Sequence, residues 1–274
     1  MMSDSKRIKI GLIQLSSSSD IDENLKAAEK LIKDSVSDGA EMVVLPETFA
    51  LMEKYNGQKL DFVEPPGQGK IQDWMKRVAK ENQVALVGGT IAVESEIKER
   101  PYARCYVYAP DGSVITHYDK IHMFDVAVKD DEVYSESANT LAGYETKTFE
   151  FKDIKFGLSV CYDLRFPEVY RLYQKQNVEV ILAPSAFTLQ TGKVHWNLLL
   201  QARAVENLCF VVAPNQTGLH DNKRKTYGHS LFVGPWGDVL AEMDNQVGYI
   251  NHEIDTQQIN AIKKRFPVHT HRKL

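Results

Sequence analysis

Residues 156–168 place a cysteine where a nucleophile could be presented to a substrate. The apolar, β-branched run 154–160 predicts a short buried strand, and Cys161 follows it directly, ahead of a polar turn that contains Pro167. Open α/β sheets place their sites at the carboxyl ends of strands, so Cys161 is a candidate for nucleophilic catalysis. The alternative is a small buried hydrophobe, the usual role of a lone cysteine in an apolar strand.

A carboxylate and an ammonium occupy similar positions in the chain. The strand-like run 41–45 leads into Glu47, and the run 113–118 leads into Lys120. Taken singly, Glu47 fits a solvated loop start and Lys120 fits a surface charge. Taken with Cys161, they supply the base, the oxyanion partner and the nucleophile that acyl transfer requires.

The segments around these residues resemble motifs of the nitrilase superfamily of carbon-nitrogen hydrolases. The motifs are L-P-E-T-F around Glu47, Y-D-K-I-H-M-F-D-V around Lys120 and C-Y-D-L-R-F-P-E around Cys161, and others continue through Q-A-R-A-V-E-N at 201–207. The resemblance covers nearly the whole chain. It is strongest to the small amidases that include omega-amidase and deaminated glutathione amidase, in which a second glutamate lies sixteen residues beyond the lysine. That position is Glu136 here.

The resemblance implies a role for each of these residues. Glu47 takes the proton of the Cys161 thiol and later returns it to the leaving nitrogen. Lys120 and the backbone N–H of Tyr162 stabilise the oxyanion. Glu136 holds Lys120 and the substrate amide in register, and water hydrolyses the remaining thioester. This cycle uses no metal and no organic cofactor.

The expected function is therefore an amidohydrolase that cleaves a terminal carboxamide of a small acid through a cysteine thioester. Residues 185–188 and 216–230 resemble deaminated glutathione amidases more than omega-amidases, which act on α-ketoglutaramate or α-ketosuccinamate. A different class also stays open, a catalytically silent dimeric binding scaffold on the same fold. The complete set of four reactive residues argues against that class.

Several further residues are candidates for substrate binding, namely Tyr162, Arg165, Phe187, Thr188, Arg224 and Tyr227. Arg165 is the expected anchor for a carboxylate near the nucleophile, and Arg224 for a distant one. Arg165 could instead pair with Asp163 to stabilise a turn. Phe187 could instead pack in the core. His122 fits a structural hydrogen-bonding role better than a titrating one.

Strands and helices alternate along the chain, which predicts the α/β class. The resemblance adds that the fold is a four-layer αββα sandwich, that residues 1–274 form one domain, and that the protein is at least a homodimer. Segment 126–143 is expected to be a polar excursion that carries Glu136. The expected strands are 7–15, 42–45, 84–93, 102–109, 113–118, 154–160, 178–184, 209–214, 230–234, 238–243 and 248–254. The expected helices are one capped by Asp20 that stops at Gly39, then 70–82, 167–176, 195–207 and one capped by Asp255 that runs to Arg265.

Composition restricts the class of partner. A formal net charge of -4 over 274 residues shows no excess of positive charge, which binding to nucleic acid or to an anionic membrane would favour. A small-molecule amide is therefore the expected partner. Three cysteines without a C-x-x-C pair predict neither a disulfide framework nor a metal site. The first residues contain no apolar signal core, and no apolar run approaches the ~20 residues of a membrane span. These features predict a cytoplasmic protein.

Overall fold

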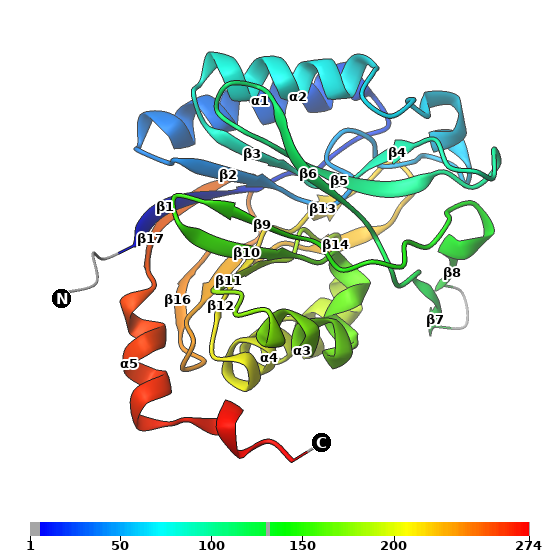
Figure 1. Ribbon diagram of the computed structural model, residues 1–274. Coiled ribbons are helices and arrows are strands. Elements are labelled where there is room, and N and C mark those ends of the chain that lie inside the picture. Colours follow the sequence, from blue (N-terminus) through cyan, green and yellow to red (C-terminus); the bar gives the residue numbers. More distant parts are fainter. Residues whose placement is uncertain (1–5, 130–131, 274) are drawn as a thin grey trace.

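The computed structural model describes residues 6–129 and 132–273. It is a four-layer αββα sandwich, in which two sheets face each other and each sheet is covered by a pair of helices on its outer side (Figure 1). The α/β class and the αββα sandwich predicted from the sequence are thus confirmed. Residues 1–5, which precede the first strand, lie outside the described residues.

The first sheet has the order β17-β1-β2-β3-β5-β4, and β6 also pairs with β5. Its three central strands run parallel to one another, and antiparallel partners lie on both sides. Its strands are β1 (Arg7–Gln14), β2 (Met42–Leu45), β3 (Ala85–Gly88), β4 (Ile91–Val93), β5 (Tyr102–Tyr108), β6 (Val114–Asp119) and β17 (Gly248–Asp255).

The second sheet repeats this plan with the order β16-β15-β12-β11-β10-β9. Here β10, β11 and β12 are the parallel strands. The strands are β9 (Thr148–Phe151), β10 (Ile154–Leu158), β11 (Val180–Leu182), β12 (Phe210–Ala213), β15 (Leu231–Val233) and β16 (Val239–Glu242). Two short hairpins stand apart from the sheets, β7 (Asp125–Lys129) with β8 (Glu132–Ser135), and β13 (Thr217–Leu219) with β14 (Lys225–Tyr227).

Helices α1 (Ile21–Ser37) and α2 (Lys70–Glu81) cover the first sheet, and α3 (Pro167–Lys175) and α4 (Leu189–Asn207) cover the second (Figure 1). Helix α5 (Gln257–Arg265) lies at one side. Strand periodicity explains the layers, because successive side chains point to opposite faces. Met42 and Val44 enter the core between the sheets, whereas Val43 and Leu45 pack beneath α1 and α2.

Some expected elements differ in extent. The strand expected at 84–93 is two strands, β3 and β4, which are separated where Gly89 adopts a positive φ of 43°. A Cβ on Gly89 would lie 1.9 Å from the carbonyl oxygen of Pro46, so the chain turns there to admit the segment that carries Glu47. The expected polar excursion at 126–143 is partly the β7–β8 hairpin, and its residues 130 and 131 lie outside the described residues.

Helix ends show two further differences. Helix α4 begins at Leu189 rather than residue 195, with Thr188 as its cap. Gly192 lies in its first turns because the Tyr227 ring occupies the space that a Cβ would need. Glycine is a poor helix former, so the sequence does not predict a helix before residue 195. The residue before α5 is Thr256, although Asp255 still accepts a hydrogen bond from the N–H of Gln257. Asp20 caps α1 as predicted and accepts from the N–H of Glu23.

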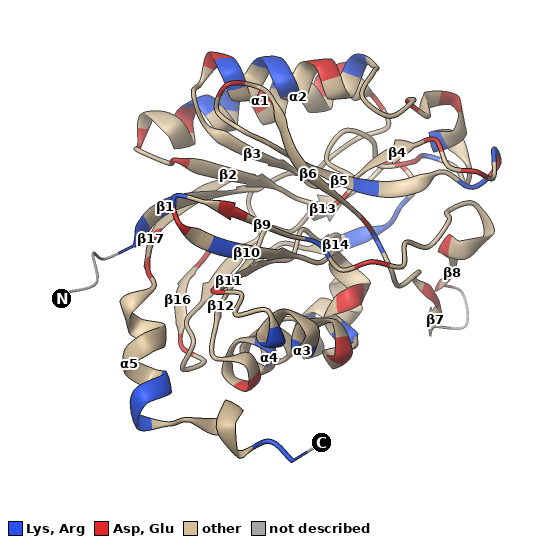
Figure 2. Cartoon of the chain, in the orientation of Figure 1, with Lys and Arg blue, Asp and Glu red and all other residues tan. Residues whose placement is uncertain are grey.

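Charges of both signs alternate along the outer faces of α1 and α2 (Figure 2). This mixed surface agrees with the small net charge of -4. Among the helices of the described part of the chain, none combines the length and the apolar content that crossing a membrane demands.

Candidate active site

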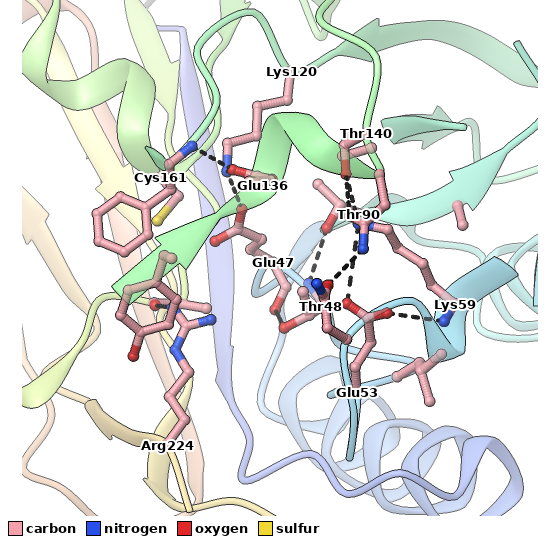
Figure 3. A pocket seen from close by; sticks show the side chains of 18 of the residues that line it. Glu47, Thr48, Glu53, Lys59, Thr90, Lys120, Glu136, Thr140, Cys161 and Arg224 are labelled. Atoms are coloured by element: carbon pink, nitrogen blue, oxygen red, sulfur yellow. Dashed lines mark hydrogen bonds and ion pairs between the residues drawn. The ribbon is translucent and has the colours of Figure 1, made fainter. Parts of the chain in front are cut away.

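Three strand ends converge on one cavity between the sheets. Glu47 follows β2, Lys120 follows β6, and Cys161 lies three residues beyond β10. Figure 3 shows the three side chains pointing toward one another, with Glu136 beside them. The Lys120 Nζ donates to Glu47 Oε1 at 2.8 Å and to both oxygens of Glu136 at 2.9 and 2.8 Å. All four side chains line the same cavity.

Glu47 is held by its neighbours in a strained backbone segment. The next residue, Thr48, has a positive φ of 56°, and its N–H donates to Thr90 Oγ1 at 2.9 Å. Gln216 donates to the Glu47 carbonyl oxygen at 3.1 Å. The Glu47 side chain is buried, so its carboxylate is fixed in direction toward Lys120.

The backbone at Cys161 is also strained. Cys161 has φ 46° and opens a short 3-10 helix, Cys161–Arg165. Its N–H donates to the Pro184 carbonyl at 3.0 Å. Such left-handed conformations in residues other than glycine cost free energy and cluster at functional sites. This one turns the thiol out of the strand direction and into the cavity.

Asp163 holds this turn in place. Its carboxylate is fully buried and accepts from the N–H of Val160 at 2.8 Å, the Tyr118 hydroxyl at 2.7 Å and the N–H of His122 at 3.0 Å. The His122 ring also contacts Asp163 at 2.7 Å and stacks on Phe166, in a structural arrangement. Asp163 therefore supports the turn at Cys161 through these groups, and among the described residues it forms no ion pair with Arg165.

Burial sets the protonation of the thiol and the ammonium in opposite ways. Burial raises the pKa of Cys161, the Glu47 carboxylate raises it further, and Lys120 only partly opposes them. The resting thiol is therefore protonated and needs a base. Burial alone would lower the pKa of Lys120, but the carboxylates of Glu136 and Glu47 outweigh it and raise the pKa above its ordinary value. Lys120 stays a cation.

Glu136 reaches the cluster from the β7–β8 hairpin. It is the first residue of a 3-10 turn, Glu136–Ala138, directly after β8. Besides Lys120, it accepts from the N–H of Phe124 at 2.7 Å. The N–H of Ser137 donates to Asp125 Oδ1 at 2.9 Å and ties the end of the hairpin to its start. Glu136 is thereby held by main-chain contacts, which a solvated loop charge would lack.

The cavity has a volume of about 410 Å³. Five of the six residues predicted for substrate binding line it, and these are Tyr162, Arg165, Phe187, Thr188 and Arg224. The sixth, Tyr227, is not among the described residues that line it. Its ring instead stacks on His229 with centroids 4.3 Å apart and packs over Gly192.

Phe187 and Thr188 have structural contacts as well. Phe187 packs on Trp196 with centroids 4.8 Å apart, and Thr188 Oγ1 accepts from the N–H of Thr191 at the start of α4. Phe187 therefore packs in the core and lines the cavity at the same time, because the core of the second sheet forms one wall of the cavity.

The two arginines differ in how fully they are engaged. Both terminal nitrogens of Arg165 donate to His195 Nδ1 at 3.3 Å, and its guanidinium lies over the rings of Tyr162 and Phe187. Arg224 donates to the Ala186 carbonyl. The Nε of Arg224 is buried without an acceptor among the described residues. A buried unpaired donor is costly, and a ligand oxygen would satisfy it.

Sequence reasoning missed Lys59. This lysine lines the cavity from the 3-10 turn Gln58–Phe62. Lys54 lines the same cavity, and neither lysine is marked by periodicity or by a motif in this polar loop, so the sequence gives no sign that they face inward.

Iodoacetamide is expected to alkylate Cys161 before the other two cysteines. The exposed fraction is 7% for Cys161, 0% for Cys105 and 1% for Cys209, so only Cys161 presents its sulfur to a cavity. Since the pKa of Cys161 is raised, its alkylation rate should keep increasing with pH up to the alkaline limit of stability. Peptide mapping after timed labelling of the folded protein measures these rates. Equal labelling of all three cysteines would contradict this geometry.

The chain is similar to known proteins over most of its length. The carbon-nitrogen hydrolase family matches residues 9–264. A deaminated glutathione amidase of Synechocystis sp. is 38% identical over 95% of this chain and 96% of its own length. Omega-amidase NIT2 of Xenopus tropicalis is 33% identical over 97% of this chain and 95% of its own.

The structural comparison points the same way. The crystal structure of the Caenorhabditis elegans NitFhit protein superposes with a TM-score of 0.91 and 32% identity, over 99% of this chain and 66% of that one. Matches of this extent cover both sheets, the three strand ends of the site and the turn that carries Glu136. The chain therefore belongs to the carbon-nitrogen hydrolase family of the nitrilase superfamily, and it is a hydrolase that acts on the carbon-nitrogen bonds of amides.

Proposed function

We propose that the protein is a deaminated glutathione amidase with Cys161 as its nucleophile. The observation that carries the proposal is one cavity of about 410 Å³ that joins a thiol, a carboxylate and a lysine to further cationic side chains. Such a cavity suits an acid substrate with an amide bond. The 38% identical relative named for this activity supports the same choice.

The proposed reaction begins with proton transfer from the Cys161 thiol to Glu47. The sulfur attacks the amide carbon, and negative charge develops on the amide oxygen near Lys120 and the N–H of Tyr162. Glu47 then gives its proton to the leaving nitrogen, which departs as a neutral amine. Water, deprotonated by Glu47, hydrolyses the thioester and releases the acid and the thiol. Glu136 orients Lys120 throughout.

Deaminated glutathione has an α-keto acid at one end and a glycine carboxylate at the other, and both of its amides are secondary. The nitrogen that leaves is therefore part of a dipeptide amine, whereas a terminal carboxamide releases ammonia. We place the carboxylates against the cations of the cavity wall, with Arg165 and Arg224 as candidates. Tyr162, Phe187 and Thr188 would contact the part of the substrate between its two carboxylates. Tyr227 would support the site indirectly, through its contacts with Gly192 and His229.

A second candidate is omega-amidase activity on α-ketoglutaramate or α-ketosuccinamate. The observation in its favour is the 33% identical relative over nearly the full chain. These substrates share the α-keto acid and the amide chemistry, so the same four residues would serve them.

We further propose a single domain over residues 1–274, a homodimer and a cytoplasmic location. The family match over 9–264 supports one domain. Exposed apolar side chains on the outer face of α3 and α4 support a subunit contact there, and they are Leu172, Val194, Leu198 and Val205. The cysteines Cys105, Cys161 and Cys209 are all unpaired, as in a reducing compartment.

A panel of amides tests the proposed activity. We expect the purified protein to release α-ketoglutarate from deaminated glutathione with a higher kcat/KM than from α-ketoglutaramate. N-carbamoyl amino acids and a simple nitrile serve as negative substrates. Preference for α-ketoglutaramate would establish the second candidate instead, and activity on the nitrile alone would contradict both.

A further inference from the structure

Lys59 is a desolvated cation in the wall of the cavity. Its side chain is only 19% exposed, and burial lowers its pKa. The Nζ donates to Thr140 Oγ1 at 2.5 Å, and the nearest carboxylate among the described residues, Glu53, lies at 4.0 Å, the limit of an ion pair. An ammonium has three N–H donors, so this one is incompletely satisfied by the protein.

The groups around Lys59 form a polar subsite. Thr140 is buried, and Asn139 and Asn56 line the cavity beside it. Asn139 donates to Asn56 Oδ1 at 2.6 Å, which fixes both amides. Glu53 is the main charge that opposes the effect of burial on Lys59, but its oxygen lies 4.0 Å from the Nζ and the pKa of Lys59 still stays lowered. A carboxylate entering this subsite would complete the contacts of the ammonium.

The position of Lys59 relative to Glu47 and Cys161 determines which end of a substrate can reach it. The charges of Glu136, Lys120 and Glu47 all act on Lys59. Figure 3 shows Glu47 between Cys161 and Lys59, with Arg224 on the side of Cys161. Contacts agree with this view, because Arg224 donates to the Ala186 carbonyl and the Ala186 backbone also hydrogen-bonds to Cys161. Glu47 thus separates two cationic ends of the cavity.

We infer that Lys59 binds a carboxylate on the amine side of the scissile amide. This inference rests on the proposed function, in which Glu47 returns its proton to the leaving nitrogen. The leaving amine must then face Glu47, and its remaining atoms extend beyond Glu47 toward Lys59. The substrates are therefore secondary amides whose amine is a small peptide with a free carboxylate.

This placement changes the expectation for the two arginines. Lys59 takes the distant carboxylate that sequence reasoning gave to Arg224, and Arg224 serves the α-keto acid beside Cys161. A primary amide such as α-ketoglutaramate releases ammonia and leaves the Lys59 subsite without a ligand. Lys59 is then a specificity residue that separates peptide-like substrates from primary amides.

Lys59→Met tests the inference with three substrates. These are deaminated glutathione, its analogue with a C-terminal carboxamide in place of the glycine carboxylate, and α-ketoglutaramate. The wild-type enzyme should prefer the acid over its carboxamide analogue by ~10- to 100-fold in kcat/KM, mainly through KM, the effect of one charge-assisted hydrogen bond. Lys59→Met should abolish this preference, and it should lower kcat/KM for α-ketoglutaramate by a smaller factor than kcat/KM for deaminated glutathione.

Three comparison variants complete the experiment. Lys59→Arg should keep most of the preference, because the charge remains. Lys76→Met removes an exposed lysine of α2 and should behave as wild type. Arg224→Ala should weaken deaminated glutathione and α-ketoglutaramate alike.

The possible outcomes distinguish a failure of the Lys59 inference from a failure of the proposed function. If wild type hydrolyses the acid and its carboxamide analogue equally well, Lys59 does not bind that carboxylate, while the amidase proposal stands. If Lys59→Met lowers kcat/KM for all three substrates by the same factor, Lys59 is structural and the inference fails. Wild-type hydrolysis of neither deaminated glutathione nor its analogue would overturn the proposed substrate, and the inference with it.

Discussion

Cys161→Ala is expected to lower kcat by at least ~10⁴-fold, the scale on which loss of a nucleophile acts in other acyl-transfer enzymes. The fold should survive, because the sulfur contributes little packing at the edge of a cavity and because alanine meets the same backbone strain at φ 46° as cysteine does. Steady-state turnover of deaminated glutathione and a thermal melt of the same sample measure both effects.

Cys209→Ala is the matched control for this variant. Cys209 is 1% exposed, packs in the core of the second sheet and has no place in the cavity. Its replacement should lower the melting temperature through the lost core contacts while kcat stays near the wild-type value. Activity in Cys161→Ala within tenfold of wild type would exclude covalent catalysis by this thiol.

Lys120→Met is expected to remove activity and also to destabilise the protein. The loss in kcat should reach ~10²–10³-fold or more, the effect of deleting one oxyanion donor. Without the ammonium, the carboxylates of Glu47 and Glu136 lose the cation that pairs with both of them, and the coulombic attraction of Lys59 does not replace this direct ion pair. Removing one partner of such a cluster costs about 3–5 kcal/mol. Kinetics and chemical denaturation of the variant check the two effects.

Glu47→Gln separates the chemical role from the structural one. Glutamine keeps the size of the side chain, and its amide oxygen can still accept from Lys120, but it cannot take the thiol proton. We expect a loss of ~10²–10⁴-fold in kcat with nearly normal stability. Glu136→Gln should also impair kcat, while Glu99→Gln, at an exposed position, should have no effect. A fully active Glu47→Gln enzyme would remove this carboxylate from the proton transfers.

The parts of the site that could be predicted lie close in sequence to strand ends. Cys161 and Glu47 each follow an apolar run within a few residues, so local pattern predicts both their element and their edge of the sheet. The family resemblance supplies Glu136, whose position depends on a hairpin that its sequence marks only weakly. Strand pattern cannot tell which sheet a strand joins, so the two-sheet arrangement also came from the resemblance.

The remaining parts depend on contacts between distant segments. Lys59 is a cavity residue because Thr140, 81 positions later, meets its ammonium. Tyr227 lies outside the lining because Gly192 leaves room for its ring, a pairing that no local pattern reveals. The supporting role of Asp163 likewise requires Tyr118, which arrives from another strand.

The strand ends that carry the reacting groups belong to different sheets. Glu47 and Lys120, 73 residues apart, come from the first sheet, and Cys161 comes from the second. The proposed catalytic centre therefore lies at the boundary between the two sheets, and it exists only while the sheets stay packed face to face. Contacts between distant segments carry a loop-closure cost in folding, and they are lost together when the two sheets separate. Enzymatic activity should therefore vanish in one step when the two sheets separate, ahead of any loss of the helices that cover the outer faces.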